Sequence, residues 1–469
     1  MTTINWEKEV DSRKDQLMKD LDDLLRIDSV KDLANKSDEF PVGPGPTKAL
    51  QKFLEFGERD GFVTKNIENV AGHIEFGDGD ETFGILGHVD VVPVGDGWET
   101  DPFVPVIKDG KLYARGSSDD KGPVMAAYYG LKIIKELGLP VSKKVRFIVG
   151  ADEESGWYCM DRYRASETMP DFGFSPDAQF PIINGEKGIA SYILSFPDVP
   201  KKDGDYVLEE MNSGIAANMV PGDATVKVTV KNGDINEMKA AFEKYIADNK
   251  LGGEAQIDGQ VITIKLVGKQ AHAQNPKAGI NSATHLCNFL SDYAFDGKDA
   301  AYINNTAKFL HDDYQGKKVG IDHVDETMGE LTSSPNMFRY GLGDEPTILT
   351  NVRFPKGSGV DKIVEQVKAH VTEAHVEAAP GAQDPHYTPV TDPMVKTFLD
   401  TYEKYTGEKG VEKTIGGGTY ARLFERGCAY GALFPGREDV MHQANEYMYV
   451  EDIYKAAVIY ADAIYQLIK

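Results

Sequence analysis

The chain has 469 residues, of which 41% are hydrophobic and 10% aromatic, and its 51 basic and 75 acidic side chains give a formal net charge of −24. This apolar content is enough for a sizeable core, which excludes global disorder. The negative charge argues against nucleic acid and anionic membranes as partners, because their phosphates bind clustered Lys and Arg. At about 150 residues per domain, the length predicts two or three domains.

The three cysteines are too few and too scattered for a disulfide framework or a cysteine-based zinc cluster. Buried thiols in a reducing compartment explain them best. The first residues lack the apolar stretch of a signal peptide, and no run approaches the roughly 18 apolar residues of a membrane helix. We therefore expect a cytoplasmic protein.

The N-terminal part of the chain favours an α/β domain. Apolar positions at helical spacing predict helices over residues 6–28 and 47–60. Short β-favouring runs then alternate with a helix, and the predicted elements are strands at 83–92, 145–150 and 172–174 and a helix at 123–137. This alternation is typical of a largely parallel sheet that is covered on both faces.

The middle of the chain has a different pattern. Residues 224–230 alternate between apolar and polar side chains, as in a sheet with one solvated face. The other predictions are a helix at 235–249, a hairpin near Asp258 and Gly259, a strand at 347–353 and a helix at 359–374. The α/β pattern then returns, with helices near 392–405 and 451–468. The chain is thus interpreted as an α/β domain with a largely parallel mixed sheet (1–186 and 386–469), interrupted by an inserted α+β domain (187–385).

Four short segments place acidic or imidazole side chains next to these predicted strands or before the predicted helix. They contain His88 and Asp90, Asp119 and Asp120, Glu153 and Glu154, and Asp177. In doubly wound sheets the ligand crevice lies beyond the carboxyl ends of the strands, so the segments can converge. Converging carboxylates resist burial unless a cation balances them. Histidine with Asp and Glu suits a pair of zinc-like ions, and a free carboxylate beside them can accept a proton from water.

Each of these segments also has an ordinary structural interpretation. Asp119 and Asp120 before a helix are typical capping residues, and residues 153–154 are typical of a solvated loop. Asp177 after a proline is typical of a turn, and His88 in an apolar run is typical of a hydrogen-bonded core histidine. Each interpretation is favoured when taken singly, but four such segments in one α/β unit favour a functional site.

The sequence resembles the M20 metallopeptidases in four segments, which are residues 87–93, 114–122, 152–156 and 175–177. Residues 268–281 resemble the motif of that family's inserted domain, and residues 441–442 resemble its last metal ligand. Residues 38–46 and 415–425, together with the long insert, look most like the bacterial PepV-type dipeptidase branch. The family includes aminoacylases, carboxypeptidases and dipeptidases. The resemblance implies a zinc-peptidase-like catalytic domain with an inserted lid.

The resemblance also implies a role for each polar residue near the strands. Asp119 would bridge two Zn²⁺ ions, for which Co²⁺ or Mn²⁺ are possible substitutes. The other metal ligands would be His88, Glu154, Asp177 and His442. Glu153 would be the general base, and Asp90 would orient the His88 ring. The choice of Asp119 over Asp120 rests on the family pattern alone.

The insert would supply the groups that contact substrate. His272 would stabilise the oxyanion of a tetrahedral intermediate. Asn218 and Arg353 match positions that contact substrate, and the Arg353 guanidinium would bind a free carboxylate. Backbone N–H groups before a predicted helix would bind the same carboxylate, and they belong to Gly416, Gly417, Gly418 and Thr419. A structural ion pair is the alternative for Arg353, and a turn position is the alternative for Asn218.

Together these features predict a zinc-dependent metallopeptidase that hydrolyses the peptide bond of unblocked dipeptides. The length of the insert favours a monomer. The same metal centre is also compatible with an N-acyl amino acid deacylase or a carboxypeptidase. A non-catalytic peptide-binding protein is a more distant alternative.

Overall fold

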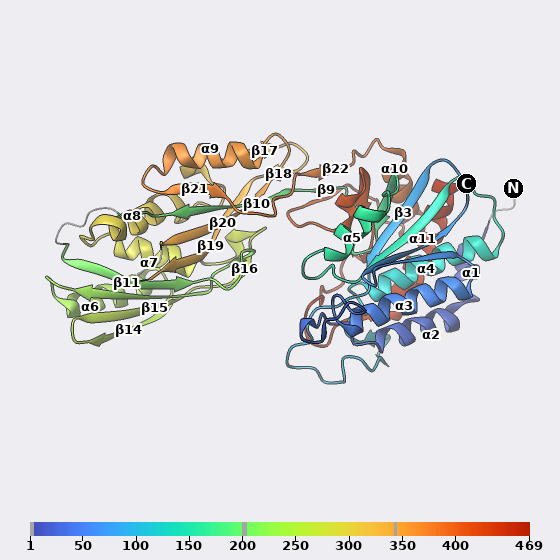
Figure 1. The fold of residues 1–469 in the computed structure, drawn as a ribbon, viewed down its shortest axis with the longest axis horizontal. Coiled ribbons are helices and arrows are strands. Elements are labelled where there is room, and N and C mark those ends of the chain that lie inside the picture. Colours follow the sequence, from blue (N-terminus) through green and yellow to red (C-terminus); the bar gives the residue numbers. More distant parts are fainter. Residues whose placement is uncertain (1–3, 199–203, 342–344) are drawn as a thin grey trace. The chain divides into compact units, whose positions relative to one another are not determined.

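The computed structural model describes residues 4–198, 204–341 and 345–469. The chain divides into two compact units (Figure 1). The first unit comprises residues 1–185, 387–413 and 418–469, and the second comprises residues 186–386 and 414–417. None of the helices in these described segments is long and apolar enough to cross a membrane.

The first unit is built around a mixed sheet of six strands. Their order is β1 (Val63–Ile67), β2 (Ala71–Phe76), β6 (Lys144–Gly150), β3 (Thr82–His88), β7 (Phe172–Ser175) and β24 (Arg426–Ala429). The last four run parallel to one another, whereas β1 and β2 are antiparallel strands at one edge. The three strands predicted in this region are β3, β6 and β7, so the largely parallel α/β sheet is confirmed.

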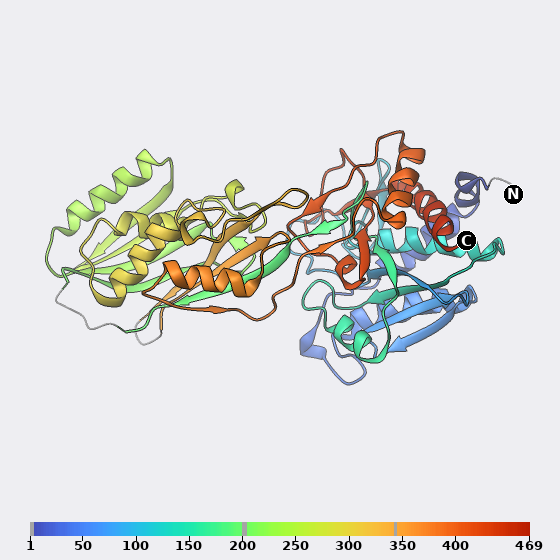
Figure 2. The ribbon, with the colours of Figure 1, turned by 90° about the horizontal axis from the view of Figure 1, so that it is seen from above.

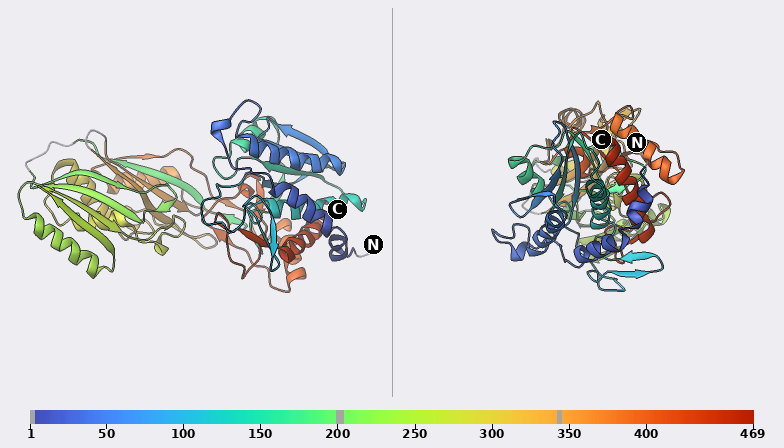
Figure 3. Two further views of the ribbon diagram at one scale, coloured as in Figure 1. Left: turned by 90° about the horizontal axis from the view of Figure 1, so that it is seen from below. Right: turned by 90° about the vertical axis from the view of Figure 1, so that its right-hand side faces the viewer.

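Helices cover both faces of this sheet (Figure 3). They are α1 (Trp6–Asp11), α2 (Lys14–Leu25), α3 (Pro44–Arg59), α4 (Lys121–Glu136), α5 (Tyr158–Ser166), α10 (Pro393–Thr406) and α11 (Val450–Ile468). Ile74 of β2 packs against Gly57 of α3, and the preceding His73 is hydrogen-bonded to Tyr163 of α5. Because successive strand residues point to opposite faces, α3 and α5 lie on opposite sides of the sheet.

The shorter elements of the first unit connect these layers. They are η1 (Leu33–Asn35), β4 (Val106–Lys108), β5 (Lys111–Tyr113), β8 (Ala178–Gln179), η5 (Tyr420–Leu423), β25 (Ala432–Leu433) and β26 (Tyr447–Tyr449). Strands β4, β5 and β26 form a small antiparallel sheet, and β8 pairs with β25. The pairing of β26 with β5 holds residues near the C-terminus beside the segment that leads into α4.

The single helix predicted over residues 6–28 is wrong, because the structure has two helices there, α1 and α2. The Ser12 hydroxyl donates to the Glu9 carbonyl, and the Arg13 N–H donates to Val10, three residues back. These local bonds end the α-helical ladder at Ser12. The apolar periodicity continues across the break, which is why the sequence pattern concealed it.

The second unit is an antiparallel sheet of eight strands with helices on one face (Figures 1 and 2). The strand order is β14 (Gly252–Asp258), β15 (Val261–Val267), β13 (Asp223–Val230), β11 (Tyr206–Ser213), β19 (Thr332–Tyr340), β20 (Thr347–Phe354), β10 (Gly188–Ser195) and β21 (His375–Ala378). In β13, Val226 and Val228 are buried while Lys227 is exposed. The predicted sheet with one solvated face is therefore confirmed.

The buried face of this sheet carries the second core. The covering helices are α6 (Ile235–Asp248), α7 (Ser282–Leu290), α8 (Gly297–Asn305), the π-helical η3 (Thr306–Leu310) and α9 (Val360–His370). The short elements are β12 (Met219–Val220), β16 (Ala271–His272), η2 (Pro276–Ala278), η4 (Lys317–Val319), β17 (Val324–Asp325) and β18 (Gly329–Glu330). Strands β9 (Gly185–Glu186), β22 (His386–Tyr387) and β23 (Thr414–Ile415) lie where the chain passes from one unit to the other. The predicted hairpin near Asp258 is confirmed by the pairing of β14 with β15.

Candidate active site

Three parallel strands of the first unit bring the predicted site residues to one edge of the sheet. His88 is the last residue of β3, Glu153 follows β6, and Asp177 follows β7. His88 pairs with Gly150 in the register of β3 and β6. The carboxyl ends of these strands therefore meet at the same edge, where open α/β sheets bind their ligands. Asp119 lies close by, two residues before α4 begins.

The five predicted metal ligands form two overlapping groups that share Asp119. His88 Nε2 lies 3.1 Å from Asp119 Oδ1 and 3.6 Å from Asp177 Oδ2. His442 Nε2 lies 2.9 Å from Asp119 Oδ2 and 3.2 Å from Glu154 Oε2. Each carboxylate oxygen of Asp119 therefore faces a different histidine, as a carboxylate that bridges two ions would require.

Asp90 lies behind the His88 ring. The Asp90 carbonyl oxygen lies 3.0 Å from His88 Nδ1, and its Oδ1 lies 3.5 Å from the same nitrogen. The Asp90 carboxylate also accepts the backbone N–H groups of Glu153 and Glu154, at 3.0 and 3.2 Å. Nδ1 is thus the nitrogen that donates to Asp90, and Nε2 faces the carboxylates. This tautomer is the one that a metal-binding histidine needs.

Asp120 has a different position from Asp119. Its Oδ2 accepts the backbone N–H of His88 at 3.2 Å. A Cβ atom at Gly87 would lie 2.7 Å from that oxygen, so the close approach of Asp120 requires glycine at this position. Within the described segments, Asp120 belongs to neither ligand group. The structure therefore places Asp119, and not Asp120, between the two histidines.

The concentration of carboxylates shifts their proton affinities. Burial and the nearby Asp119 carboxylate raise the pKa of Glu154 to about 7. Burial also raises the pKa of Glu153 well above its usual range. Hydrogen bonds to Asp119 and Glu154 raise the pKa of His442 to about 11. A site with these shifts holds more negative charge than its protein surroundings balance, which favours a bound cation.

The donor atoms present fit divalent metal ions. Glu154 Oε1, in the ligand group of Asp119 and His442, is buried without a hydrogen-bond partner among the described residues. Such buried oxygens are costly unless something satisfies them, and a cation does so for a carboxylate. Two imidazole nitrogens with carboxylate oxygens form the donor set of catalytic zinc sites and of related Co²⁺ and Mn²⁺ sites. The two groups sharing Asp119 would hold one ion each.

The second unit contains His272, Asn218 and Arg353, which the sequence linked to substrate. His272 of β16 pairs with Met219 of β12, and the Ala273 N–H donates to the Asn218 carbonyl at 2.9 Å. The Gln274 N–H donates to His272 Nδ1 at 3.1 Å. Because Nδ1 accepts, the neutral ring carries its proton on Nε2. Partial desolvation of the ring and the charge of Arg353 lower the pKa of His272, which favours this neutral donor form.

Arg353 contacts the part of the glycine-rich turn that belongs to the second unit. Arg353 is 5% exposed, and it donates through Nε to Asn351 Oδ1 and through Nη1 to the Gly416 carbonyl, both at 2.9 Å. Gly417 also lies in the second unit, whereas Gly418 and Thr419 lie in the first. The predicted helix after Thr419 is only the four-residue 3₁₀ turn η5. The Thr419 hydroxyl accepts the Ala421 N–H at its start, and the turn ends because the backbone is already extended at Phe424.

Comparison with known proteins identifies the family. The model of "Peptidase family M20/M25/M40" matches residues 84–466. The chain belongs to this family. The predicted resemblance to M20 peptidases and the prediction of a peptide-bond hydrolase are therefore confirmed.

Relatives of this M20-family peptidase span its whole length. It is 46% identical over 467 residues to the "Beta-Ala-Xaa dipeptidase" of Lactobacillus delbrueckii subsp. lactis, which covers 99% of both chains. It is 41% identical over 467 residues to the "Putative dipeptidase YtjP" of Bacillus subtilis (strain 168), which covers 99% of this chain and 100% of the relative. The aminoacylhistidine dipeptidase structure from Vibrio alginolyticus has a TM-score of 0.59 at 14% identity, with 97% and 96% of the two chains covered. That structural likeness shows a shared fold.

The M20-family site also contains Glu446, which the sequence interpretation missed. Glu446 is fully buried, and its carboxylate accepts the backbone N–H groups of Gly116, Ser118 and Asp119 at 2.8 to 3.1 Å. Arg115 Nη1 donates to it at 2.7 Å. Glu446 therefore fixes the loop that carries Asp119. Its place four residues after His442 was the available signal, but a single acidic residue in a loop carries no pattern of its own.

Replacing Glu446 by glutamine is expected to lower the free energy of unfolding of this peptidase by about 3 kcal/mol, because it leaves the buried Arg115 charge without a carboxylate. The affinity for divalent metal ions should fall by about 10- to 100-fold, since the Asp119 loop loses its support. Urea denaturation and zinc titration against a chelator measure the two effects.

The matched control is Glu451→Gln. Glu451 pairs with Arg437 at 2.6 Å, but its side chain is 74% exposed. An exposed pair contributes roughly 0 to 1 kcal/mol. Equal effects of Glu446→Gln and Glu451→Gln would show that Glu446 does not support the loop.

Proposed function

We propose that this peptidase is a zinc-dependent dipeptidase that hydrolyses the peptide bond of unblocked dipeptides. The main observation in its favour is that two groups of candidate metal ligands share Asp119. The first group adds His88 and Asp177, and the second adds Glu154 and His442. Relatives named "Beta-Ala-Xaa dipeptidase" and "Putative dipeptidase YtjP" match over the whole chain. They support short free peptides as substrates, including those that begin with β-alanine.

Two bound ions would polarise the substrate carbonyl group and lower the pKa of a water molecule. Glu153 is the residue that accepts the proton of this attacking water and delivers it to the leaving amine. The Trp157 Nε1–H donates to Glu153 Oε1 at 3.2 Å, and Asp90 accepts the Glu153 N–H. One hydrogen bond therefore orients the Glu153 side chain, and a second fixes its backbone. Within the described segments it belongs to neither ligand group, which leaves it available for proton transfer.

The polar residues of the second unit would bind the parts of the dipeptide that do not react. The His272 Nε2–H donates to the carbonyl oxygen as negative charge develops on it. The Arg353 guanidinium binds the terminal carboxylate, with N–H groups of residues 416–419 and the Asn218 side chain as further contacts. A carboxylate held in this way requires that the substrate end one residue beyond the cleaved bond.

Substrate blocking and metal removal test the proposal. Treatment with a chelator should abolish hydrolysis of free dipeptides, and Zn²⁺ should restore it. An N-acetylated dipeptide and a dipeptide amide should be cleaved at least 100-fold more slowly than the free dipeptide, with all three measured as kcat/KM. Faster cleavage of the N-acetylated substrate would indicate a deacylase, and efficient cleavage of longer peptides would indicate a carboxypeptidase.

We also propose that the chain acts as a monomer in the cytoplasm. The support for a monomer is the length of the insert, because a unit that spans residues 186–386 is long enough to serve the active site of its own chain. The cysteines Cys159, Cys287 and Cys428 are buried, which suits a reducing compartment. Sedimentation equilibrium should give a mass near 51.6 kDa. An obligate dimer would overturn the monomer.

A further inference from the structure

The second unit contains a group of candidate metal ligands that the proposed peptidase mechanism does not use. It consists of His285, His311 and Asp312, whose ligand atoms all lie within 4.8 Å of one another. His285 belongs to α7, and the other two residues follow η3 directly. The group therefore joins two segments that are separated by more than twenty residues of sequence.

Both imidazole rings are oriented by a hydroxyl group. The Tyr245 hydroxyl lies 3.0 Å from His285 Nδ1, and the Thr284 hydroxyl lies 3.3 Å from His311 Nδ1. With both Nδ1 atoms engaged, Nε2 is the ring nitrogen left to bind a ligand. The ring centroids lie 4.6 Å apart with an angle of 76° between the planes, so the rings are not stacked face to face. A metal-binding histidine donates its other ring N–H to a neighbouring oxygen, and here a hydroxyl oxygen lies where it can accept that bond.

The separation of one pair of donor atoms fits a small ion. His311 Nε2 lies 3.4 Å from Asp312 Oδ2. A tetrahedral zinc ion with Zn–N and Zn–O bonds near 2.0 to 2.1 Å separates its ligand atoms by about 3.3 Å. The observed distance is long for a direct hydrogen bond but matches one edge of such a tetrahedron.

The backbone before the ligands has an unusual conformation. The His311 N–H donates to the Thr306 carbonyl at 3.0 Å, which closes the π-helical turn η3. Asp312 then has a φ of 51°, in the left-handed region. π-Helical turns are rare and occur frequently at functional sites. Here the turn and the left-handed residue present two consecutive side chains to α7.

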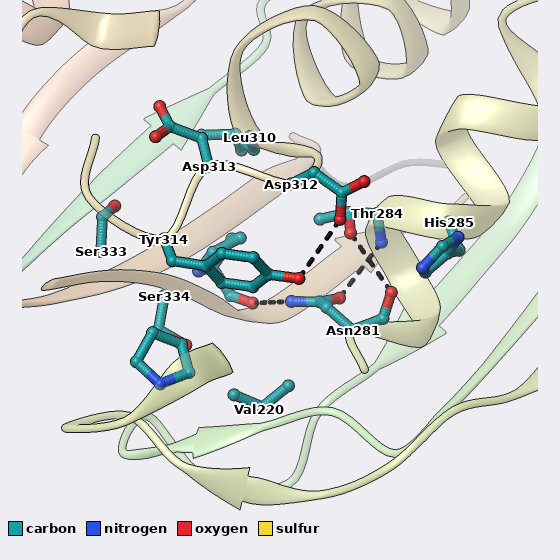
Figure 4. A pocket seen from close by; sticks show the side chains of 12 residues that line it. Val220, Asn281, Thr284, His285, Leu310, Asp312, Asp313, Tyr314, Ser333 and Ser334 are labelled. Atoms are coloured by element: carbon teal, nitrogen blue, oxygen red, sulfur yellow. Dashed lines mark hydrogen bonds between the residues drawn. The ribbon is translucent and has the colours of Figure 1, made fainter. Parts of the chain in front are cut away.

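A small cavity beside the group can hold the remaining ligand. Its volume is about 10 Å³, and His285, Asp312, Tyr314 and Asn281 are among the residues that line it (Figure 4). This is space for a single water molecule. The Tyr314 hydroxyl donates to Asp312 Oδ1 at 3.3 Å, which orients the carboxylate and leaves Oδ2 facing His311.

Burial lowers the pKa of both His285 and His311, that of His311 to about 4, so neutral imidazoles are present at neutral pH.

We propose that His285, His311 and Asp312 bind one divalent transition-metal ion, separate from the ions held around Asp119. Two imidazoles and one carboxylate favour Zn²⁺, Co²⁺ or Ni²⁺ over Mg²⁺ and Ca²⁺, which prefer oxygen ligands throughout. A water molecule in the adjoining cavity completes the four ligands. The ion would link α7 to the segment after η3, because it would bind ligands from both, and it would therefore stabilise the fold of the second unit.

The decisive variant is Asp312→Asn. Asparagine keeps the shape of the side chain and tolerates a positive φ, and Asp312 is exposed, so the variant is expected to fold. Metal-free full-length chain is titrated with Zn²⁺ alone, and bound zinc is counted after removal of free metal. The wild type should bind one equivalent more than Asp312→Asn, whatever the number of ions around Asp119. His311→Asn should lose the same equivalent.

Matched measurements separate this site from general damage. Asp258→Asn, at an exposed hairpin of the second unit, should keep the wild-type zinc count. Hydrolysis of a free dipeptide by Asp312→Asn should equal that of the wild type once both are loaded with zinc. Zinc should raise the thermal midpoint of the wild type by more than that of the variant. Equal zinc counts in the wild type, Asp312→Asn and His311→Asn would overturn the proposal.

Discussion

The Glu153→Gln variant is expected to lose at least 10³-fold in kcat on a free dipeptide while it retains its full metal content. Glutamine keeps an oxygen for the Trp157 indole, which lies 3.2 Å from Glu153 Oε1, but it cannot accept a proton from water. General base catalysis contributes about 10²- to 10⁴-fold. Steady-state kinetics and elemental analysis of the same preparation measure the two quantities.

Asp119→Asn provides the contrasting result. Each Asp119 oxygen faces a different histidine, at 3.1 Å from His88 and 2.9 Å from His442. Asp119→Asn should therefore lower both the number of bound metal ions and the turnover rate, whereas Glu153→Gln should lower the turnover rate alone. Near-normal turnover in Glu153→Gln would exclude Glu153 as the base. Loss of metal in that variant would make Glu153 a ligand. The exposed Glu99→Gln is the control for removal of an acidic side chain from a loop of the first unit.

The sequence predicted that several polar residues lie close together, because the order of the strands and the chemistry of the residues that follow them indicate the same edge of the sheet. His88, Glu153 and Asp177 come at or just after the ends of β3, β6 and β7, and these strands are neighbours that run in parallel. Apolar strand patterns are visible in a sequence, and parallel strands end at a common edge. Polar residues at those ends therefore converge without any knowledge of side-chain conformation.

Other parts of the site depend on contacts that leave no pattern. His442 is known from sequence only by family resemblance, because it lies in a loop with a left-handed φ of 63°. Spacing alone does not distinguish Asp119 from Asp120, because only the directions of the two side chains differ. Glu446 acts through backbone N–H groups of a loop more than 300 residues earlier. The partners in such long-range hydrogen bonds do not recur at a regular spacing in the sequence, so a sequence pattern does not reveal them.

Local bonds limit the prediction of helices in the same way. The pattern over residues 6–28 has a continuous apolar face, yet Ser12 ends α1 by bonding to the Glu9 carbonyl. The apolar face reports which side of a helix is buried, and it does not report whether the backbone ladder is unbroken.

The second large effect concerns His272. His272→Ala is expected to lower kcat by about 10²- to 10³-fold with less than a threefold change in KM and no change in metal content, because it removes one hydrogen-bond donor to the developing oxyanion. The Gln274 N–H bond to His272 Nδ1 places the proton on Nε2, where the donor is needed. The exposed His370→Ala, also in the second unit, should leave kcat unchanged.

A tetrahedral inhibitor separates this role from ordinary substrate binding. A phosphinic dipeptide analogue carries a tetrahedral phosphorus in place of the attacked carbon, so its affinity reports binding of the transition state. If His272 acts on the oxyanion, His272→Ala should weaken the inhibitor by the same factor by which it lowers kcat/KM. The opposite result is a His272→Ala variant with a raised KM, an unchanged kcat and wild-type affinity for the inhibitor. It would show that His272 binds the substrate before the reaction and does not stabilise the transition state. Because the inhibitor needs no proton from Glu153, the comparison is independent of the assignment of the base.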